Sequence, residues 1–289
     1  MGEEAFQVLD AGLGASLQDE GRIGWRRFGV PVSGAMDSHA MHWANQLLGN
    51  PVEVPVLELL LQGARLRALR ALWLAVTGAD AQANVPTWRT VRVSKNDVVE
   101  FPRNRSGVWA YLAVEGGFGG QGTLGSASTY VRGALGGPIT RGQELHTLPG
   151  AELQFPHQIA GRIADWSERR NYDQPPPLRV WRGPQWSLFD DAVREQFFSQ
   201  RWVISSRSDR VGYRLEGVPL RAPAREIISE PVLVGSIQVP PNGQPIVTMR
   251  DGPPVGGYPK IGLVDPDDVS RLAQCRPGTK VSFLSREDS

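Results

Sequence analysis

Two stretches of the sequence place the same residue types at the same spacing. In the first stretch, Ser33 is followed after four positions by Asp37 and after 21 more by Glu58. The second stretch repeats this order and spacing with Ser205, Asp209 and Glu230. In both, a leucine follows the glutamate after three positions and a glycine after five. The match indicates two copies of one β-rich unit with a cleft between them, and the alternative is a coincidence between two β-rich segments.

Short strands and turns dominate the rest of the pattern. The 33 glycines and 23 prolines are spread along the 289 residues without a period. Both residue types interrupt helices and strands, so this composition favours many short strands over long helices. Regularly spaced strands of this kind predict a barrel or a sandwich. Apolar runs between the breaks predict strands at 6–9, 54–61, 66–69, 72–77, 90–93, 98–101, 109–114, 178–181, 232–239, 246–249 and 281–284.

Three helices are predicted between the strands. Over 37–48, apolar residues recur at spacings of three and four, which places them on one helix face. Ser33 or Asp37 is the expected cap, and the Gly-Asn-Pro sequence at 49–51 ends the helix. Two further helices are predicted over 187–198 and 265–274. The apolar face of the first helix consists of Ala40, Met41, Ala44, Leu47 and Leu48. Between 14 and 22 the sequence predicts a polar loop flanked by glycines.

Charge and cysteine content exclude several classes of protein. The 31 basic and 30 acidic side chains leave a net charge of +1, which gives no electrostatic basis for binding nucleic acid or an anionic membrane. The single cysteine, Cys275, excludes an intrachain disulfide. No apolar run approaches the roughly 20 residues of a transmembrane helix. The acidic start of the chain lacks the apolar core of a signal peptide, so we expect a cytoplasmic protein.

A charged, proline-rich segment divides the chain. Residues 167–177 end in three consecutive prolines, and such segments act as stiff spacers. We therefore predict two lobes, the first at 1–177 and the second at 178–289. The first lobe contains a glycine- and hydroxyl-rich loop, and the spacer closes it.

Familiar cofactor and metal motifs are present only in part. Residues 117–122 match the glycine spacing of a dinucleotide-binding loop, but the residues that follow predict no helix to hold a pyrophosphate. The sequence holds no phosphate-binding GxxxxGK[ST] loop and no nucleophile elbow. His39 and His42 lie three positions apart on the predicted first helix and lack a third ligand, so we predict no metal site.

Three polar clusters are the candidates for a functional site. Hydroxyls, backbone N–H groups and guanidinium groups together suit a carboxylate or a phosphate. Asp–Arg neighbours also form purely structural ion pairs, which is the alternative for each cluster. We expect Glu58 and Glu230 to lie in matching strands, where they are either buried and paired or placed in the cleft. The clusters are Gln18, Asp19 and Arg22; Ser126, Ser128, Thr129 and Arg132; and Ser205, Ser206, Asp209, Arg210 and Arg214.

Motifs along nearly the whole chain resemble those of one family. They are QDEGR at 18–22, GVPVSGAMD at 29–37, ANQLLGN at 44–50, YLAVEGG at 111–117, GSASTY at 125–130, GPQ at 183–185, SDRVGYRLEG at 208–217, GSIQVP at 235–240 and GGYP at 256–259. The sequence resembles the C subunit of the prokaryotic ATP-dependent 5-oxoprolinase. This family is also described as allophanate hydrolase subunit 2 and as the antagonist of a sporulation kinase inhibitor. It is related to the carboxyltransferase domain of biotin-dependent urea carboxylase.

The resemblance implies a fold, partners and a reaction. It implies a mainly β protein with two cyclophilin-like β-barrel lobes from an internal duplication and few short helices. It also implies two partner proteins that correspond to the A and B subunits of the oxoprolinase. With these partners the chain would hydrolyse 5-oxo-L-proline to L-glutamate at the expense of ATP with Mg²⁺. Under this expectation the isolated chain is inactive, and no cofactor is bound covalently.

Motif matches imply which residues form the site. Their expected contribution is to stabilise the negative charge that develops on an amide or phosphate oxygen. The catalytic residues implied are Asp209, Arg210 and Arg22. The substrate-binding residues implied are Gln18, Ser126, Ser128, Thr129, Gln238 and Tyr258.

Two other functions stay open, and the family pattern is not fully kept. The chain could be the carboxyltransferase component of a urea carboxylase or allophanate-type system, with biotin arriving on another polypeptide because no biotin-acceptor motif occurs here. It could instead be a non-catalytic, regulatory binder of a kinase inhibitor that resembles the B subunit. Pro254 and Val255 replace two threonines that are usual in the family, and Ala127 stands where an arginine is common. If those groups contact substrate, this chain has a changed substrate or a weaker activity.

Overall fold

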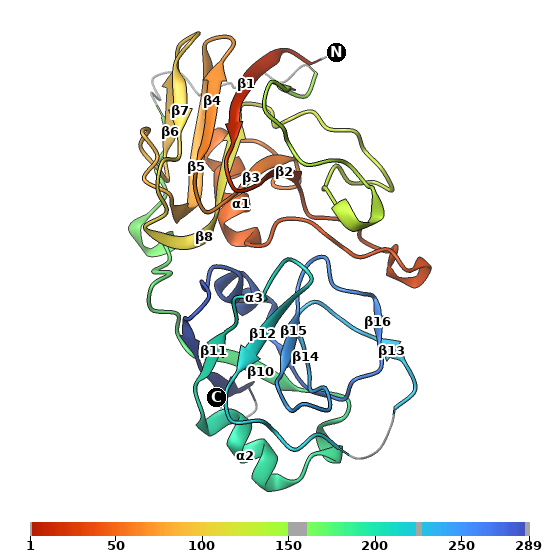
Figure 1. The fold of residues 1–289 in the computed structure, drawn as a ribbon. Coiled ribbons are helices and arrows are strands. Elements are labelled where there is room, and N and C mark those ends of the chain that lie inside the picture. Colours follow the sequence, from red (N-terminus) through yellow and green to blue (C-terminus); the bar gives the residue numbers. More distant parts are fainter. Residues whose placement is uncertain (1, 150–160, 224–226, 287–289) are drawn as a thin grey trace. The chain divides into compact units, whose positions relative to one another are not determined.

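The computed structural model describes residues 2–149, 161–223 and 227–286, and the fold is mainly β (Figure 1). Internal contacts divide the chain into two units. The first consists of residues 1–23 and 33–172, and the second of residues 24–32 and 173–289. The lobe boundary predicted at residue 177 stays a prediction.

Two antiparallel sheets share one apolar core in the first unit. The four-stranded sheet has the order β7 (Val98–Glu100), β4 (Ala64–Ala68), β1 (Glu4–Ala11) and β9 (Glu144–His146). The five-stranded sheet has the order β2 (Ala15–Gln18), β3 (Val56–Leu60), β8 (Ser106–Val114), β5 (Leu72–Asp80) and β6 (Thr90–Val93). Buried side chains alternate along strands such as β4, so one face of each sheet supplies the core.

Helix α1 (Ser38–Leu48) packs on β5 and β8 of the five-stranded sheet. The Asp37 side chain caps it by accepting a hydrogen bond from the Ala40 N–H at 3.1 Å. Gly49 ends it with a left-handed φ of 69°, which glycine adopts without steric cost. The predicted helix over 37–48 and its apolar face are therefore confirmed. Short 3₁₀ turns of this unit lie at Val131–Gly133 and Trp166–Glu168.

An eight-stranded sheet forms the second unit and nearly closes on itself. Its edge strands, β18 and β19, are separated in sequence by Ser282 alone, so the two edges must lie close together in space. This arrangement is a nearly closed barrel, which leaves little exposed sheet edge. The strand order is β18 (Lys280–Val281), β11 (Trp202–Ile204), β12 (Gly212–Glu216), β15 (Ile246–Thr248), β14 (Ser236–Gln238), β17 (Lys260–Val264), β10 (Leu178–Arg182) and β19 (Phe283–Ser285).

Smaller elements accompany the barrel. A two-strand ribbon pairs β13 (Glu230–Pro231) with β16 (Val255–Gly256). Helix α3 (Pro266–Ala273) is capped by Asp265, which confirms the helix predicted over 265–274. The helix predicted over 187–198 is confirmed from Asp191 onward, and its predicted start is wrong. The structure has a 3₁₀ turn at Trp186–Leu188 and then α2 (Asp191–Ser199), because Asp190 caps a new helix by accepting from the Val193 N–H.

The mainly β prediction is confirmed, and every predicted strand range overlaps a strand. The loop predicted over 14–22 is wrong in its first part, because residues 15–18 form β2 and pair antiparallel with β3. Strands β9, β11, β12, β13, β16 and β17 were not predicted. They are short, or carry charged residues such as Arg214 and Lys260, so their local sequence gives only a weak preference for a strand. Pairing with neighbouring strands stabilises them instead.

The equally spaced residues of the two stretches lie in different local structures. Asp37 caps helix α1, whereas Asp209 accepts hydrogen bonds from the Val211 and Gly212 N–H groups in a turn before β12. Glu58 lies in the five-stranded sheet, whereas Glu230 lies in the two-strand ribbon. Equal spacing along the sequence therefore does not place these residues in the same kind of local structure.

Candidate functional site

One cluster of the first unit brings together five of the nine predicted site residues. We call it the Asp19 cluster. It joins the end of β2, the loop that follows, and the hydroxyl-rich loop after β8. All its members are at least nine-tenths buried. They are Gln18, Asp19, Arg22, Ser126, Ser128 and Thr129.

The Asp19 carboxylate is the centre of this cluster. Its Oδ1 accepts from the Ser126 hydroxyl at 2.6 Å, the Ser128 hydroxyl at 2.5 Å and the Gly21 N–H at 2.8 Å. Its Oδ2 accepts from the Ala127 N–H at 2.7 Å. Hydrogen bonds to an ionised acceptor are about twice as strong as neutral ones, so this one side chain ties two distant loops together. The hydroxyls of Ser126 and Ser128 are engaged with Asp19, and their predicted contact with substrate stays a prediction.

Arg22 and Gln18 also bind the hydroxyl-rich loop, through its backbone carbonyl oxygens. The Arg22 Nη2 donates to the Ser128 carbonyl oxygen at 2.5 Å, and the Gln18 Nε2 donates to the Thr129 carbonyl oxygen at 3.2 Å. The Thr129 N–H donates to the Leu17 carbonyl oxygen at 2.9 Å. Arg22 is 1% exposed, so a guanidinium that is always charged lies inside the first unit. Such a group can stabilise negative charge in a low-dielectric site.

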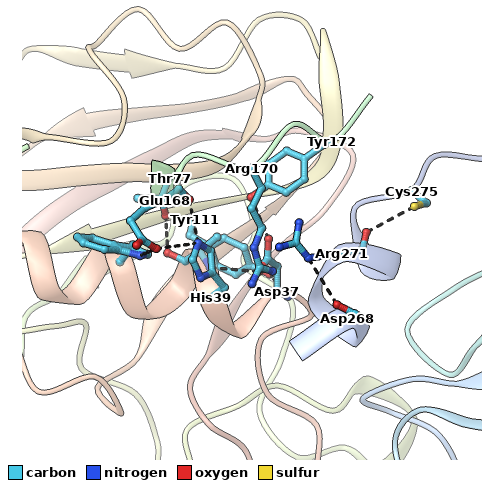
Figure 2. Close-up of polar contacts among 12 residues, drawn as sticks. Asp37, His39, Thr77, Tyr111, Glu168, Arg170, Tyr172, Asp268, Arg271 and Cys275 are labelled. Atoms are coloured by element: carbon cyan, nitrogen blue, oxygen red, sulfur yellow. Dashed lines mark hydrogen bonds and ion pairs between the residues drawn. The ribbon is translucent and has the colours of Figure 1, made fainter. Parts of the chain in front are cut away.

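A second polar network lies beside α1 in the same unit (Figure 2). The Tyr111 hydroxyl donates to the Glu58 Oε2 at 2.8 Å and accepts from the Asp37 N–H at 2.7 Å. The Glu58 Oε2 also accepts from the Met36 N–H at 2.8 Å. Burial, followed by the charge of Glu58, raises the pKa of Tyr111 well above its ordinary value. The phenol therefore stays a proton donor, and the network fixes the chain from Met36 into the helix.

The segment before residue 173 closes over the start of α1. The Tyr172 hydroxyl donates to the Asp37 Oδ2 at 3.1 Å, and the Trp43 Nε1 donates to the Glu168 Oε2 at 3.1 Å. The His39 Nε2 lies 2.9 Å from the Glu168 carbonyl oxygen. Figure 2 shows His39 between Glu168 and Asp37. Burial lowers the pKa of His39 below its ordinary value. The partner of His39 in the structure is thus the Glu168 backbone of the same unit.

Asp209 and Arg210 of the second unit form a turn and an ion pair. The Asp209 Oδ1 accepts from the Val211 N–H at 2.9 Å, which is a local turn contact. The Arg210 guanidinium binds the Asp251 carboxylate through two hydrogen bonds of 2.8 and 3.1 Å. Both side chains of that pair are largely buried. Arg210 thus forms a structural ion pair, which was the alternative to a functional role for this cluster. The catalytic roles of Asp209 and Arg210 stay predictions.

We expect Arg210→Gln to lower the free energy of unfolding by about 1–3 kcal/mol, because it leaves a largely buried carboxylate without its partner. Urea unfolding monitored by tryptophan fluorescence measures the change. The matched control is Arg207→Gln, since the Arg207–Glu216 pair is exposed and 3.9 Å apart. Its expected effect is within about 0.5 kcal/mol. If both variants were equally stable and only Arg210→Gln abolished turnover of the assembled enzyme, Arg210 would belong to the reaction and not to the fold.

Five polar side chains lie on or near β17 in the second unit. The Lys260 Nζ and the Gln185 Nε2 both bind the Glu230 Oε1, at 2.5 and 2.7 Å. Gln238 lies directly opposite Lys260 on the neighbouring strand and donates to the Thr248 hydroxyl at 3.0 Å. The hydrogen bond from Lys260, with a further contribution from Gln185, lowers the pKa of Glu230. Lys260 is 3% exposed, so this is a buried cation with a partly exposed carboxylate partner.

Tyr258 lies on a pocket of about 740 Å³ in the second unit. Pockets of this size are typical for small ligands. Prolines and aliphatic side chains dominate its lining, with Arg221, Asn242 and Tyr258 as polar members. Gln238 is not among the described residues that line it, so the structure does not bring these two predicted substrate-binding residues to one pocket.

Metal ligands and membrane spans can be assessed only for the described parts of the chain. Within them, no group of three or more His, Cys, Asp or Glu side chains could hold a metal ion. Among the helices they contain, none has the length and apolar character needed to cross a membrane.

Comparison with known proteins shows to which family this chain belongs. The family described as "Carboxyltransferase domain, subdomain A and B" matches residues 28–285. The chain belongs to this carboxyltransferase domain family. The chain is also 35% identical to the C subunit of the Haemophilus influenzae 5-oxoprolinase and 33% identical to that of the Escherichia coli enzyme. Each match covers 96% of this chain and 90% of the relative. The predicted resemblance is therefore confirmed.

Solved structures share the carboxyltransferase-domain fold. The structure of TTHA0988 superimposes with a TM-score of 0.88 at 33% identity, over 98% of this chain and 56% of that chain. The urea amidolyase of K. lactis superimposes with a TM-score of 0.87 at 28% identity, over 99% of this chain and 19% of that chain. The present chain thus spans about half of the first protein and a fifth of the second.

Sequence reasoning missed two residues of this carboxyltransferase-domain chain whose side chains form the polar networks described above. Lys260 and Tyr111 were not singled out, although each is a polar residue within an apolar strand sequence. That pattern is the one available signal, because a lysine or tyrosine in a buried strand needs a partner. The partners could not be inferred, since Glu58 reaches Tyr111 through the pairing of β3 with β8, and Glu230 reaches Lys260 from a separate two-strand ribbon.

Proposed function

We propose that this chain is one component of an enzyme complex that hydrolyses 5-oxo-L-proline to L-glutamate. The observation that carries the proposal is the match to two 5-oxoprolinase C subunits over 96% of this chain and 90% of theirs. A match of nearly equal lengths means that no large part of those proteins lacks a counterpart here. The complex would contain A-like and B-like partners, and the isolated chain would be inactive.

The proposed reaction opens a stable cyclic amide. In this proposal, ATP with Mg²⁺ is a co-substrate of the assembled complex. The amide oxygen would take the γ-phosphoryl group as ADP leaves, water would add to the ring carbon as the C–N bond breaks, and a second water would hydrolyse the resulting acyl phosphate to L-glutamate and phosphate. The transferred phosphoryl group carries negative charge, so the chain would contribute buried hydrogen-bond donors and a fixed positive charge. The Asp19 cluster supports this role, because it holds the buried Arg22 guanidinium in place through the Ser128 carbonyl oxygen.

The test is glutamate release from 5-oxo-L-proline by this chain co-purified with its A-like and B-like partners. We expect release that requires ATP and disappears when this chain is omitted, and no release from this chain alone. Glutamate release by the two partners without this chain would overturn the proposal. So would a stable complex of all three that releases none with ATP present.

Carboxyl transfer is the second candidate function. It is favoured by the description of the family as a carboxyltransferase domain and by the superposition on the K. lactis urea amidolyase over 99% of this chain. The same superposition covers only 19% of that enzyme, so a carboxylase and a biotin carrier would have to come from other polypeptides. Transfer of labelled carboxylate from biotin to urea by the purified chain would favour this candidate. The regulatory role stays a prediction.

A further inference from the structure

A pocket on the exposed face of the four-stranded sheet is lined by three arginines. Its volume is about 340 Å³, at the lower end of the range for small-molecule sites. Residues 7–9 of β1 line it together with Arg65, Arg67 and Arg141, and we call it the Arg141 pocket. No carboxylate is among the described residues that line it. The pocket therefore gathers positive charge, which attracts anions.

Strand β4 directs two of these arginines to one face of the sheet. It lies beside β1 (Figure 1). Leu66 belongs to the core, whereas Arg65 and Arg67 on either side of it are exposed. Arg67 lies directly opposite Gln7 of β1, and Arg65 lies opposite Asp10. Both guanidinium groups therefore reach the pocket from the same side of β1.

A tight turn holds the third arginine on the other side of β1, where β9 follows. The Gln143 N–H donates to the Thr140 carbonyl oxygen at 3.2 Å, and Gly142 has a left-handed φ of 86°, as a type II turn requires. The Gly142 N–H donates to the Val8 carbonyl oxygen, and the Val8 N–H donates to the Gln143 carbonyl oxygen, both at 2.8 Å. These bonds fix the backbone of Arg141 beside the pocket.

Most donors of the three guanidinium groups are unused. Arg141 forms no hydrogen bond or ion pair with any residue that the structure describes. In the same part of the chain, Arg67 contacts only Gln7, through a bond of 3.5 Å that is near the upper limit for a hydrogen bond. Arg65 donates from Nε to Glu100 at 2.9 Å, which leaves its two terminal nitrogens for another acceptor. An anion in the pocket would use these donors.

The charge of the pocket matches a phosphate group. Glu100 balances one of the three guanidinium charges, so two remain. A phosphate monoester carries a charge of about −1.5 to −2 near pH 7 and has three acceptor oxygens. A carboxylate carries a single charge, and one guanidinium satisfies it through two parallel hydrogen bonds. Two further acids of the sheet, Asp10 and Glu144, do not line the pocket.

We propose that the Arg141 pocket binds the phosphate group of a small phosphate monoester, with Arg141 and Arg67 donating to its oxygens and Arg65 supplying a third positive charge. Such a site is independent of the proposed reaction, because none of its residues belongs to the Asp19 cluster. The described lining contains no aromatic side chain on which a nucleotide base could stack, which favours a small ligand over a nucleotide. The competing explanation is a set of solvated arginines that bind no ligand.

Calorimetric titration of the full chain with methyl phosphate tests the site. The ionic strength is kept constant, because salt screens exposed charges. We expect methyl phosphate to bind about 10-fold more tightly than acetate, and Arg141→Gln or Arg67→Gln to weaken its binding by about 10-fold. The matched control is Arg92→Gln, which removes the same charge from an exposed position of β6 in the same unit and should leave the affinity unchanged.

Three results of this titration would overturn the proposal. They are the absence of methyl phosphate binding by the wild-type chain, an equal affinity for acetate, and an equal weakening by Arg92→Gln and Arg141→Gln. AMP that binds about 10-fold more tightly than methyl phosphate would also overturn it, because the base would then contribute to binding.

Thermal unfolding separates binding from folding. Without ligand, Arg141→Gln should melt at the wild-type temperature, because this side chain has no partner among the described residues. A ligand that binds only the folded chain raises the melting temperature. Saturating methyl phosphate should therefore stabilise the wild-type chain and Arg92→Gln but not Arg141→Gln. An equal rise in all three chains would place the phosphate elsewhere and contradict the site.

Discussion

Replacing Asp19 by alanine is expected to lower the free energy of unfolding by about 3–5 kcal/mol. The variant leaves four donors without their acceptor, namely two hydroxyls and two backbone N–H groups. All four lie in a cluster whose central side chain is 7% exposed, so water replaces few of the lost bonds. Urea unfolding of the full chain measures the loss. The same variant should abolish turnover of the assembled enzyme, because the hydroxyl-rich loop, whose Ser128 carbonyl oxygen binds Arg22, loses its contacts with Asp19.

Two comparisons make this expectation specific. Asp10→Ala removes the same side chain from an exposed turn, where Asp10 accepts from the Gly12 N–H, and should cost less than about 1 kcal/mol. Adding Ser126→Ala and Ser128→Ala to Asp19→Ala should recover little of the loss, because these hydroxyls also accept from the Ser128 and Asp19 N–H groups, which would then lose their acceptors. An Asp19→Ala chain as stable as Asp10→Ala would show that the cluster does not hold the two loops together.

The second large effect is expected from Glu230→Gln in the second unit. The variant leaves the buried Lys260 ammonium without its ionised partner, and we expect a loss of about 3 kcal/mol. Lys260→Met breaks the same pair but leaves Glu230, whose side chain is 35% exposed and can be hydrated. Its expected cost is therefore within about 1 kcal/mol. Equal losses from the two variants would contradict the asymmetry of burial on which this expectation depends.

The pH dependence of stability provides a separate test of the pair. The ion pair lowers the pKa of Glu230 below its ordinary value of 4.5, so the unfolded state binds the proton more readily. The contribution of Glu230 is therefore complete above about pH 4.5 and is lost as the pH falls through the lowered folded-state value. Urea unfolding at several pH values below 5 should show this loss in the wild-type chain. Both Glu230→Gln and Lys260→Met should show a smaller loss over the same range.

Local features of the fold could be predicted because their causes are local. Helix α1 follows from the Asp37 cap, the Gly49 end and the apolar spacing between them, all within a short segment. The positions of most strands follow from apolar runs between glycines and prolines. The break before α2 could not be predicted. The local sequence allows the helix to begin either at the preceding turn or after the Asp190 cap, and the packed structure determines that it begins after Asp190.

The candidate site could be predicted only in part. Motif matches selected Arg22, Gln18 and the serines of the hydroxyl-rich loop, and the structure brings them together. Their contacts to Asp19 join residues 107 and 109 positions apart, which no local pattern specifies. The same matches selected Arg210, whose guanidinium pairs with Asp251, a residue 41 positions away.

The sequence by itself determined the mainly β character, the first helix and the set of residue types available for a site. Only the tertiary structure decided which of those residues are paired, buried or strained. The physical reason is that the free energy of a polar group depends on its burial and on its partners. Those partners lie far away in the sequence, so Lys260, for example, gains its partner Glu230 only when the second unit folds.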